Sequence, residues 1–293
     1  MISPLSVVVA TRNRAGRLAG TLRRLTTLPE RPPVIVIDNG STDATSAVAA
    51  DFAPQVRVLR LPSNAGATAR NVGVRNARTP YVAFADDDSW WAPGALDAAA
   101  RLFDRHPRLG LIAARTLVGP DEWVDPMSVE MAHSPLGQAP DLPGPSVIGF
   151  LACSAVVRRD AFLSAGGFDP VVFFFGEEAR LAYDLTAAGW GLAYCDEVVA
   201  HHHPAGGCDP GKRWLARRND VLTAWMRRPV GFAAGGTVRL LREARHDPQA
   251  RDAAAELIRR LPAALWRRQP PDVRVEAALR ALSGSRPEVE PVA

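Results

Sequence analysis

Tyr81-Val-Ala-Phe-Ala-Asp86-Asp87-Asp88-Ser-Trp-Trp91 is an apolar run that ends on three consecutive carboxylates. The segment before Asp86 has the length and composition of a buried strand. Adjacent carboxylates at such a strand end repel one another unless a cation or a helix N-terminus neutralises them. Because hard oxygen ligands favour Mg²⁺ or Mn²⁺, the three aspartates indicate either a divalent-metal site or a cap for the next helix.

The chain on the N-terminal side of this stretch alternates strand and helix patterns. Short apolar runs predict strands at 5–10, 34–37, 56–61 and 81–85, with helical periodicity between them. Such alternation predicts an α/β fold with a mainly parallel sheet, right-handed crossovers and helices on both faces. Ligands of these sheets bind outside the carboxyl ends of the strands. The loops after residues 10, 37 and 85 are therefore expected on one rim.

The chain on the C-terminal side is less regular. We expect a helix at 93–106, a strand at 109–115, a long loop at 116–146 and further strand character at 146–158. Glu177 and Glu178 stand at the start of a predicted helix that Gly189 closes. Two short strands, 192–194 and 198–200, then lead into three consecutive histidines.

Length and composition are those of a globular chain. With 293 residues, 47% of them apolar and 23% charged, it can form one large domain or one domain with a smaller appendage. No uninterrupted apolar run reaches the roughly 18 residues of a membrane span, and the N-terminus lacks a secretory signal pattern. We therefore expect a cytoplasmic protein. The three cysteines are far apart and form no C-x-x-C pair, which predicts reduced thiols.

Charge divides the chain into two parts. Residues 1–211 contain 18 arginines and 22 acidic residues, whereas residues 212–293 contain 17 basic and 9 acidic residues. We interpret 1–211 as the α/β domain, 212–282 as a basic helical C-terminal extension and 283–293 as a disordered tail. A basic extension attracts phosphate-bearing partners or an anionic membrane surface, or it consists of solvated helix faces.

Three further groups of polar residues are candidates for chemistry. Asp38, at a strand end, can accept a hydrogen bond from a nucleobase imide or can close an Asx turn. Repulsion between Glu177 and Glu178 raises one pKa, which suits a general base; the alternative is a solvated first helical turn. His201 and His202 are metal ligands or members of an ordinary polar loop.

The order of these segments resembles that of glycosyltransferase family 2. The resemblance covers residues 5 to about 203 and rests on Val7-Val-Val-Ala-Thr-Arg-Asn-Arg14, Val36-Ile-Asp-Asn-Gly-Ser-Thr-Asp43, Asn64-Ala-Gly-Ala-Thr-Ala-Arg-Asn-Val-Gly73, Phe84-Ala-Asp-Asp-Asp88, Gly166-Gly-Phe-Asp169, Phe175-Gly-Glu-Glu178 and Val199-Ala-His-His202. It implies a GT-A fold, in which two abutting β/α halves share one sheet. It also implies an enzyme that transfers a hexosyl group with inversion from a nucleoside diphosphate donor.

The resemblance also implies roles for the donor-binding residues. Thr11 and Arg14 would border the nucleoside, and Asp38 would hold its base. Arg70 would lie near the donor diphosphate or sugar. Asp87 is one of the carboxylates that would contact the ribose and sugar.

A divalent cation, Mn²⁺ or Mg²⁺, is implied as cofactor. Asp86 and Asp88 match the two ends of the family's D-x-D motif. Asp88 would bind the metal, and Asp86 would support it or contact the sugar. His201, with His202 as second choice, matches the position of another metal or diphosphate contact.

The catalytic base is expected in the glutamate pair. Glu178 stands where the family has the Asp of a Glu-Asp pair, so it is the first candidate and Glu177 the second. The longer side chain changes the reach of this carboxylate. Arg180 stands where another acidic residue is common and changes the local potential.

Partners follow from the same resemblance. The donor would carry UDP, dTDP or GDP, and the acceptor hydroxyl would belong to a glycan, a lipid-linked saccharide or a small metabolite. Trp90 and Trp91 would line the acceptor site or pack in the core. The basic, Trp-containing helices from Lys212 onward lie outside the resemblance; their composition suits peripheral contact with the inner face of a membrane, binding of a lipid diphosphate acceptor, or plain packing as a helical bundle. No nucleic-acid partner is expected.

Two alternatives belong to other functional classes. A sugar nucleotidyltransferase is disfavoured because Thr11-Arg-Asn-Arg14 lacks a Gly-rich, Lys-containing phosphate loop. A non-catalytic protein that binds sugar nucleotides or serves as a scaffold on the GT-A fold is motivated by Glu178 and Arg180.

Overall fold

The computed structural model describes residues 3–204 and 210–284. Its strands are β1 (Leu5–Thr11), β2 (Val34–Asp38), β3 (Val56–Arg60), β4 (Tyr81–Ala85), β5 (Ser89–Trp91), β6 (Leu109–Val118), β7 (Trp123–Val124), β8 (Ala155–Arg158) and β9 (Gly191–His202). Its helices are α1 (Ala15–Thr26), α2 (Thr45–Ala50), α3 (Ala69–Asn76), α4 (Ala95–Arg105), α5 (Pro126–Ala132), α6 (Arg159–Ser164), α7 (Glu177–Ala187), α8 (Pro210–Arg227), α9 (Val230–Glu243), α10 (Pro248–Trp266) and α11 (Val273–Gly284).

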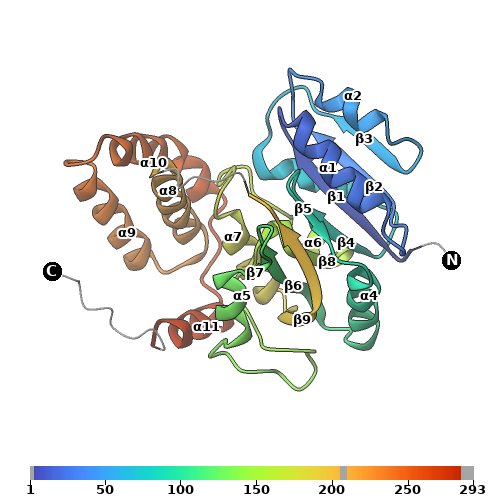
Figure 1. The fold of residues 1–293 in the computed structure, drawn as a ribbon. Helices are drawn as coiled ribbons and strands as arrows, with labels where there is room; N and C mark the ends of the chain where they lie inside the picture. The colour runs from blue at the N-terminus through green and yellow to red at the C-terminus, as the bar shows by residue number, and fades with distance from the viewer. Residues whose placement is uncertain (1–2, 205–209, 285–293) are drawn as a thin grey trace.

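The nine strands of the described chain form one continuous sheet (Figure 1). Its order is β3-β2-β1-β4-β8-β6-β9-β5, with β7 paired to β6. The strands from β3 to β4 run parallel, β8 is antiparallel to both of its neighbours, and β9 is parallel to β6. The structure confirms the predicted α/β fold. Because β1, β2 and β4 are parallel, the loops that follow them meet at one edge.

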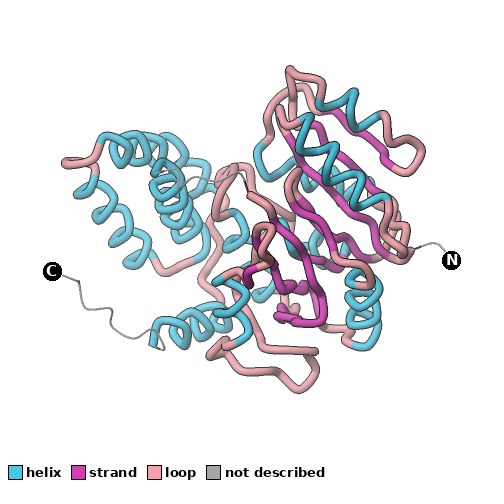
Figure 2. Tube along the Cα trace, in the orientation of Figure 1, coloured by secondary structure: helices cyan, strands magenta, loops and turns pink. Residues whose placement is uncertain are grey.

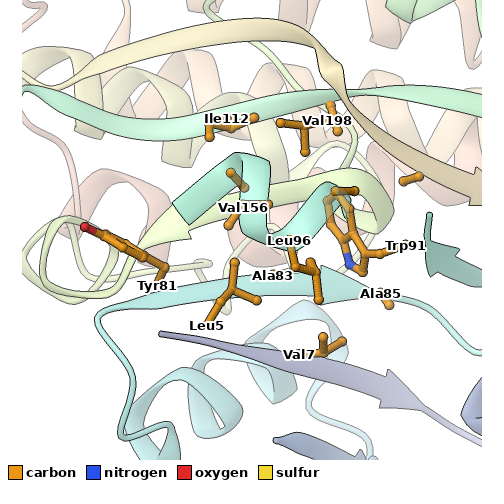
Figure 3. Close-up of a cluster of buried hydrophobic side chains, with 14 of the residues drawn as sticks. Leu5, Val7, Tyr81, Ala83, Ala85, Trp91, Leu96, Ile112, Val156 and Val198 are labelled. Carbon is orange, nitrogen blue, oxygen red and sulfur yellow. The ribbon is translucent and has the colours of Figure 1, made fainter. Parts of the chain in front are cut away.

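Alternate side chains of the central strands enter two different hydrophobic layers. Val7 and Val9 of β1 face the layer that contains α1, α2 and α4. Figure 3 shows part of this layer, in which Val7 of β1 and Trp91 of β5 lie around Leu96 of α4. Val8 faces the opposite layer, with α3, α6 and α7. Both faces are covered, so the strand sequence is a continuous apolar run.

The last strand is longer than predicted. The sequence favoured two short strands because Asp196 and Glu197 interrupt the apolar pattern, but the structure has the single strand β9. The register of its pairing with β6 shifts between Cys195 and Val199, and the two acidic residues are exposed there. The prediction of two strands was wrong because a bulge lets the acidic pair leave the sheet without ending the strand.

The predicted loop at 116–146 is partly structured. β6 continues to its end at Val118, and β7 pairs back against it. α5 begins after Asp125, whose side chain accepts a hydrogen bond from the Met127 amide at 2.8 Å, and Pro126 occupies the first helical position. Conversely, the strand predicted at 146–158 is limited to β8.

The C-terminal helices lie beside the sheet (Figure 2). α8, α9 and α10 enclose a third hydrophobic cluster, to which Val171 and Val172 contribute from the segment before α7. Arg227 of α8 donates hydrogen bonds from its Nε and Nη2 atoms to the carboxylate of Asp184 in α7. This buried pair attaches the helices to the sheet domain.

The predicted tail, 283–293, overlaps α11, which reaches Gly284, and residues 285–293 lie outside the described residues. Cys153 and Cys195 are buried free thiols. Within 3–204 and 210–284, no helix has the length and apolar character needed to cross a membrane.

Candidate active site

A pocket of about 420 Å³ lies at the carboxyl ends of the parallel strands. Seven of the residues proposed from the sequence line it: Thr11, Arg14, Arg70, Asp86, Asp87, Asp88 and His202. The residues proposed from the sequence that lie outside its lining are Asp38, Glu177, Glu178 and His201. Most of the candidates therefore lie together at the carboxyl ends of the strands, where ligands of such sheets bind.

Asp87 and Asp88 have different neighbours. Thr11 Oγ1 donates a hydrogen bond to Asp87 Oδ2 at 2.8 Å. Burial, together with the charges of the adjacent aspartates, raises the pKa of Asp87 to about 6. Asp88 lies beside two basic groups, with Oδ2 3.3 Å from Arg17 Nη1 and Oδ1 3.6 Å from His202 Nε2. Burial alone would raise the pKa of Asp88, but His202 and Arg17 lower it, so this carboxylate stays ionised.

Arg70 is the buried cation at the centre of the site. Its Nη2 atom lies 2.5 Å from Asp86 Oδ1, and its Nη1 atom lies 3.5 Å from Glu177 Oε1. Burial works against the charge of the guanidinium, but the two carboxylates hold its pKa above the ordinary value. The bridge Asp86–Arg70–Glu177 therefore joins the end of β4 to the first turn of α7.

The two glutamates of α7 differ in their surroundings. Glu177 is buried and paired with Arg70, whereas Glu178 is half-buried and forms no ion pair with a residue in 3–204 or 210–284. The Ala152 amide donates a long hydrogen bond, 3.4 Å, to Glu178 Oε1. Burial and the charge of Glu177 raise the pKa of Glu178 to about 8. A carboxyl group with such a pKa can exchange a proton near neutral pH.

Alternation along β9 separates the two candidate histidines. His202 faces Asp88, whereas His201 stacks on Trp90 with ring centroids 5.5 Å apart. His201 Nδ1 also lies 3.3 Å from Glu122 Oε1. Successive side chains of a strand point to opposite faces, so His202 lines the pocket and His201, the first choice from the sequence, does not. His202 is the histidine of the pocket.

Asp38 is fully buried beneath the rim. Its Oδ1 atom accepts a hydrogen bond from the Ser41 amide at 2.8 Å, and its Oδ2 atom accepts one from the Ser46 hydroxyl. Burial would raise the pKa of Asp38, but these hydrogen bonds lower it. The carboxylate closes a turn, which is one of the two alternatives that the sequence left open. Asn39 and Asn64, linked by a 3.1 Å hydrogen bond, reach the pocket instead.

Several lining residues were missed by the sequence analysis. Arg12 and Asn39 lie in the loops after two predicted strands. Because ligands of parallel sheets bind beside these loops, both residues could have been predicted from the sequence. The segment 173–175 lines the pocket without a polar side chain. Lys212 of α8 is the chain's only lysine, and its Nζ atom lies 6.0 Å from the centre of the Phe175 ring.

Other conspicuous residues point elsewhere. Trp91 is buried in the core, and its Nε1 atom donates to the Phe84 carbonyl at 3.1 Å. Trp90 lies against His201, as described above, and outside the lining of the pocket. Arg180 Nη2 is 2.8 Å from Asp184 Oδ2 on the side of the C-terminal helices. The positive charge of Arg180 is therefore committed to a structural network.

Asp88 and His202 are side chains that could hold a divalent cation, since a carboxylate oxygen and an imidazole nitrogen, which must lose its proton to bind a metal, lie 3.6 Å apart in the pocket. Among residues 3–204 and 210–284, no group of three or more His, Cys, Asp or Glu side chains is arranged to hold a metal ion. Mg²⁺ at nucleotide sites is commonly held by one or two side chains and completed by phosphate oxygens. The donor set fits a metal that binds together with a diphosphate.

Comparison with known proteins agrees with this geometry. The sequence profile of Glycosyl transferase family 2 matches residues 6–164. The chain belongs to this family. The resemblance stated from the motifs is confirmed, and the chain is a glycosyltransferase.

This family 2 glycosyltransferase has a relative in Mycobacterium tuberculosis, N-acetylglucosaminyl-diphospho-decaprenol L-rhamnosyltransferase. The two are 30% identical over 82% of this chain and 92% of the relative. The relative's name favours a transferase over the nucleotidyltransferase and scaffold alternatives.

Two solved structures share the fold. The mannosyltransferase PcManGT from Pyrobaculum calidifontis, in complex with GDP-Man and Mn²⁺, has a TM-score of 0.58 and 20% identity over 98% of this chain and 77% of that chain. S. aureus TarS 1–349 in complex with UDP-GlcNAc has a TM-score of 0.58 and 17% identity over 89% of this chain and 72% of that chain. These similarities establish the GT-A fold.

Proposed function

We propose that the chain transfers a hexosyl group, with inversion, from a nucleoside diphosphate donor to an acceptor hydroxyl. The Asp86–Arg70–Glu177 bridge is the observation that carries this proposal. It joins the two segments that carry the proposed chemical groups: Asp86 is two residues from Asp88, whose carboxylate stays ionised, and Glu177 is next to Glu178, whose raised pKa suits proton exchange near neutral pH. Displacement of a diphosphate needs both a stabilised leaving group and a base.

Donor binding is assigned to the pocket wall. Thr11 and Arg14 border the nucleoside, and Asp86 and Asp87 contact the ribose and sugar. Asp38 acts on the base through the turn that it holds, since its own oxygens are engaged. UDP, dTDP and GDP remain the three donor nucleotides; the two fold neighbours above bind a GDP sugar and a UDP sugar.

Asp88 and His202 would hold Mn²⁺ or Mg²⁺, and Asp86, which is paired with Arg70, would support the site beside them. When bound, the cation supplies Lewis-acid stabilisation of the charge that develops on the leaving diphosphate. Arg70 adds a fixed positive charge inside the pocket, and Lys212 adds a second one at its mouth.

Glu178 is the proposed base. It takes the proton of the acceptor hydroxyl while the oxygen attacks the anomeric carbon from the face opposite the diphosphate, so the configuration is inverted. Glu177 is the weaker candidate because its carboxylate is already paired with Arg70. The acceptor we propose is a lipid-linked saccharide, because the M. tuberculosis relative is named for a sugar linked to a diphospho-decaprenol.

A thermal-shift screen tests donor binding. We expect UDP, dTDP or GDP to raise the Tm in the presence of Mn²⁺, with little effect from ADP or CDP. A ligand at 100 times its Kd stabilises the folded state by about 2.7 kcal/mol, which is readily measured. The shift should disappear in Arg70→Met, compared with the surface control Arg108→Met. If no nucleoside diphosphate raises the Tm with Mn²⁺, the proposed donor class is wrong.

We also propose that the chain contacts a membrane through the outward face of α9. Phe232, Val238 and Leu241 are exposed on this helix by 54, 46 and 41%. Arg239 and Arg242 are exposed among them. Figure 1 places α9 at the outer edge of the C-terminal helices, away from the sheet. Apolar and basic side chains on one helix face suit an anionic bilayer surface.

Vesicle co-sedimentation tests this contact. The chain should bind vesicles that contain phosphatidylglycerol and bind phosphatidylcholine vesicles weakly. Arg239→Gln/Arg242→Gln should lower the affinity by at least tenfold, because each basic residue near the surface contributes about 1 kcal/mol. A control with Arg251→Gln/Arg259→Gln on α10 should bind like the wild type. Equal loss in both variants would contradict the assignment to α9.

A further inference from the structure

The segment Phe173-Phe174-Phe175, here called the arch, lines the pocket and leads directly into Gly176 and the glutamates of α7. Phe173 and Phe175 have φ angles of +71° and +72°. This left-handed region is unfavourable for residues with a Cβ atom, so two such residues in one short segment require strong restraint. The arch is therefore a strained element of the site.

One side of the arch is held by the short 3-10 turn Gly66–Thr68, which precedes α3. The Phe173 carbonyl accepts a hydrogen bond from the Ala67 amide at 2.6 Å. Gly66 permits this approach, because a Cβ atom there would lie 2.2 Å from the Phe173 oxygen. This contact fixes the beginning of the arch and leaves its last two carbonyl groups to another partner.

The other side is held by Asn219 of α8, which is fully buried. Its Nδ2 atom donates to the Phe174 carbonyl at 2.7 Å and to the Phe175 carbonyl at 2.5 Å. Its Oδ1 atom accepts from Arg218 Nε at 2.9 Å and from Arg218 Nη2 at 2.7 Å. The orientation of the amide is thus determined, since only the NH₂ group can donate to two carbonyl groups.

We propose that Asn219 is a positioning residue for the transfer reaction. It holds the arch in its left-handed conformation and thereby sets the start of α7, which carries Glu177 and Glu178. The inference rests on the proposed function. It also extends the catalytic unit beyond residue 211, because α8 holds the arch through Asn219 and lines the pocket through Lys212.

The physical reason is a balance between strain and restraint. Without the two hydrogen bonds from Asn219, the arch relaxes toward negative φ, and the N-terminus of α7 shifts with it. A displacement of about 1 Å in a catalytic group can reduce the rate by about 100-fold. The proposed donor contacts Thr11, Arg14 and Asp87 come from the ends of β1 and β4 and not from the arch or α7, so donor binding changes less. Asn219 therefore affects kcat more than donor affinity.

The main test compares Asn219→Ala, Asn219→Asp and the wild type in full-length protein. We expect both variants to lose about 100-fold in kcat, with the donor Kd, measured by calorimetry, changed less than about threefold. Asn219→Asp keeps the acceptor toward Arg218 and removes the donors to the arch. Thr223→Val, one turn further along α8 at a buried hydroxyl without a partner among the described residues, should keep wild-type kcat.

A double-mutant cycle separates positioning from general destabilisation. Glycine adopts positive φ without strain, so the cost of Asn219→Ala should be at least tenfold smaller in a Phe175→Gly background than in the wild type. An unchanged cost, or a wild-type kcat in Asn219→Ala, overturns the inference. If the wild type is active, neither of these two results affects the proposed function. If the wild type shows no sugar transfer and no donor hydrolysis, the proposed function itself is wrong.

Discussion

Replacement of Asp88 by alanine should abolish sugar transfer without unfolding the protein. Asp88 is the carboxylate that Arg17 and His202 keep ionised, and it faces the pocket. If it holds the cation that neutralises the leaving diphosphate, its loss should reduce kcat by at least about 10³-fold. The assay is transfer or donor hydrolysis across a Mn²⁺ titration.

The control for this prediction is Asp141→Asn. Asp141 forms an exposed pair with Arg108 outside the pocket. Exposed pairs contribute little to stability, so this variant should keep both its Tm and its activity. Asp88→Ala should retain a cooperative unfolding transition. Full activity of Asp88→Ala in EDTA would refute the metal role of this residue.

Replacement of Glu178 by glutamine should have the second large effect, a loss of about 10³-fold in kcat with unchanged donor affinity. A base must be ionised to accept a proton. Because burial and Glu177 raise the pKa of Glu178 to about 8, the carboxyl is mostly protonated at lower pH. The wild-type rate should therefore increase with pH up to about pH 8 and level off above it.

The matched control is Glu177→Gln. This change removes one of the two carboxylate partners of Arg70 and should weaken donor binding. The rate should still depend on pH because Glu178 remains, but the midpoint should move to lower pH because the charge of Glu177 helps to raise the pKa of Glu178. Glu178→Gln should flatten the pH profile. If the rate of Glu177→Gln did not depend on pH while Glu178→Gln kept the pH dependence of the wild type, Glu177 and not Glu178 would be the base.

The N-terminal half of the fold was predictable because its patterns are local. Apolar runs that end on polar loops specify buried parallel strands, and parallel strands bring their carboxyl ends to one edge. The loops after β1 and β4 therefore met as expected, with Thr11 hydrogen-bonded to Asp87. The predictions failed where a pattern is interrupted, as at Asp196 and Glu197, since a bulge and a strand end look alike in sequence.

The neighbours of each site residue were not predictable in the same way. The sequence placed His201 and His202 together at a strand end, but the pairing of β5 with β9 decides which of them faces Asp88. Arg180 is close in sequence to the glutamates and points to Asp184. These choices depend on strand register and helix phase, which are set by long-range packing.

Local sequence was sufficient to specify the alternation of strands and helices, the rim of polar loops and the family-like order of the motifs. Contacts between distant segments alone specify the bridge from Asp86 through Arg70 to Glu177 and the support of the arch by Asn219. The reason is physical: hydrophobic periodicity is a property of neighbouring residues. Ionisation and backbone strain depend on groups that folding brings together from far apart in the chain.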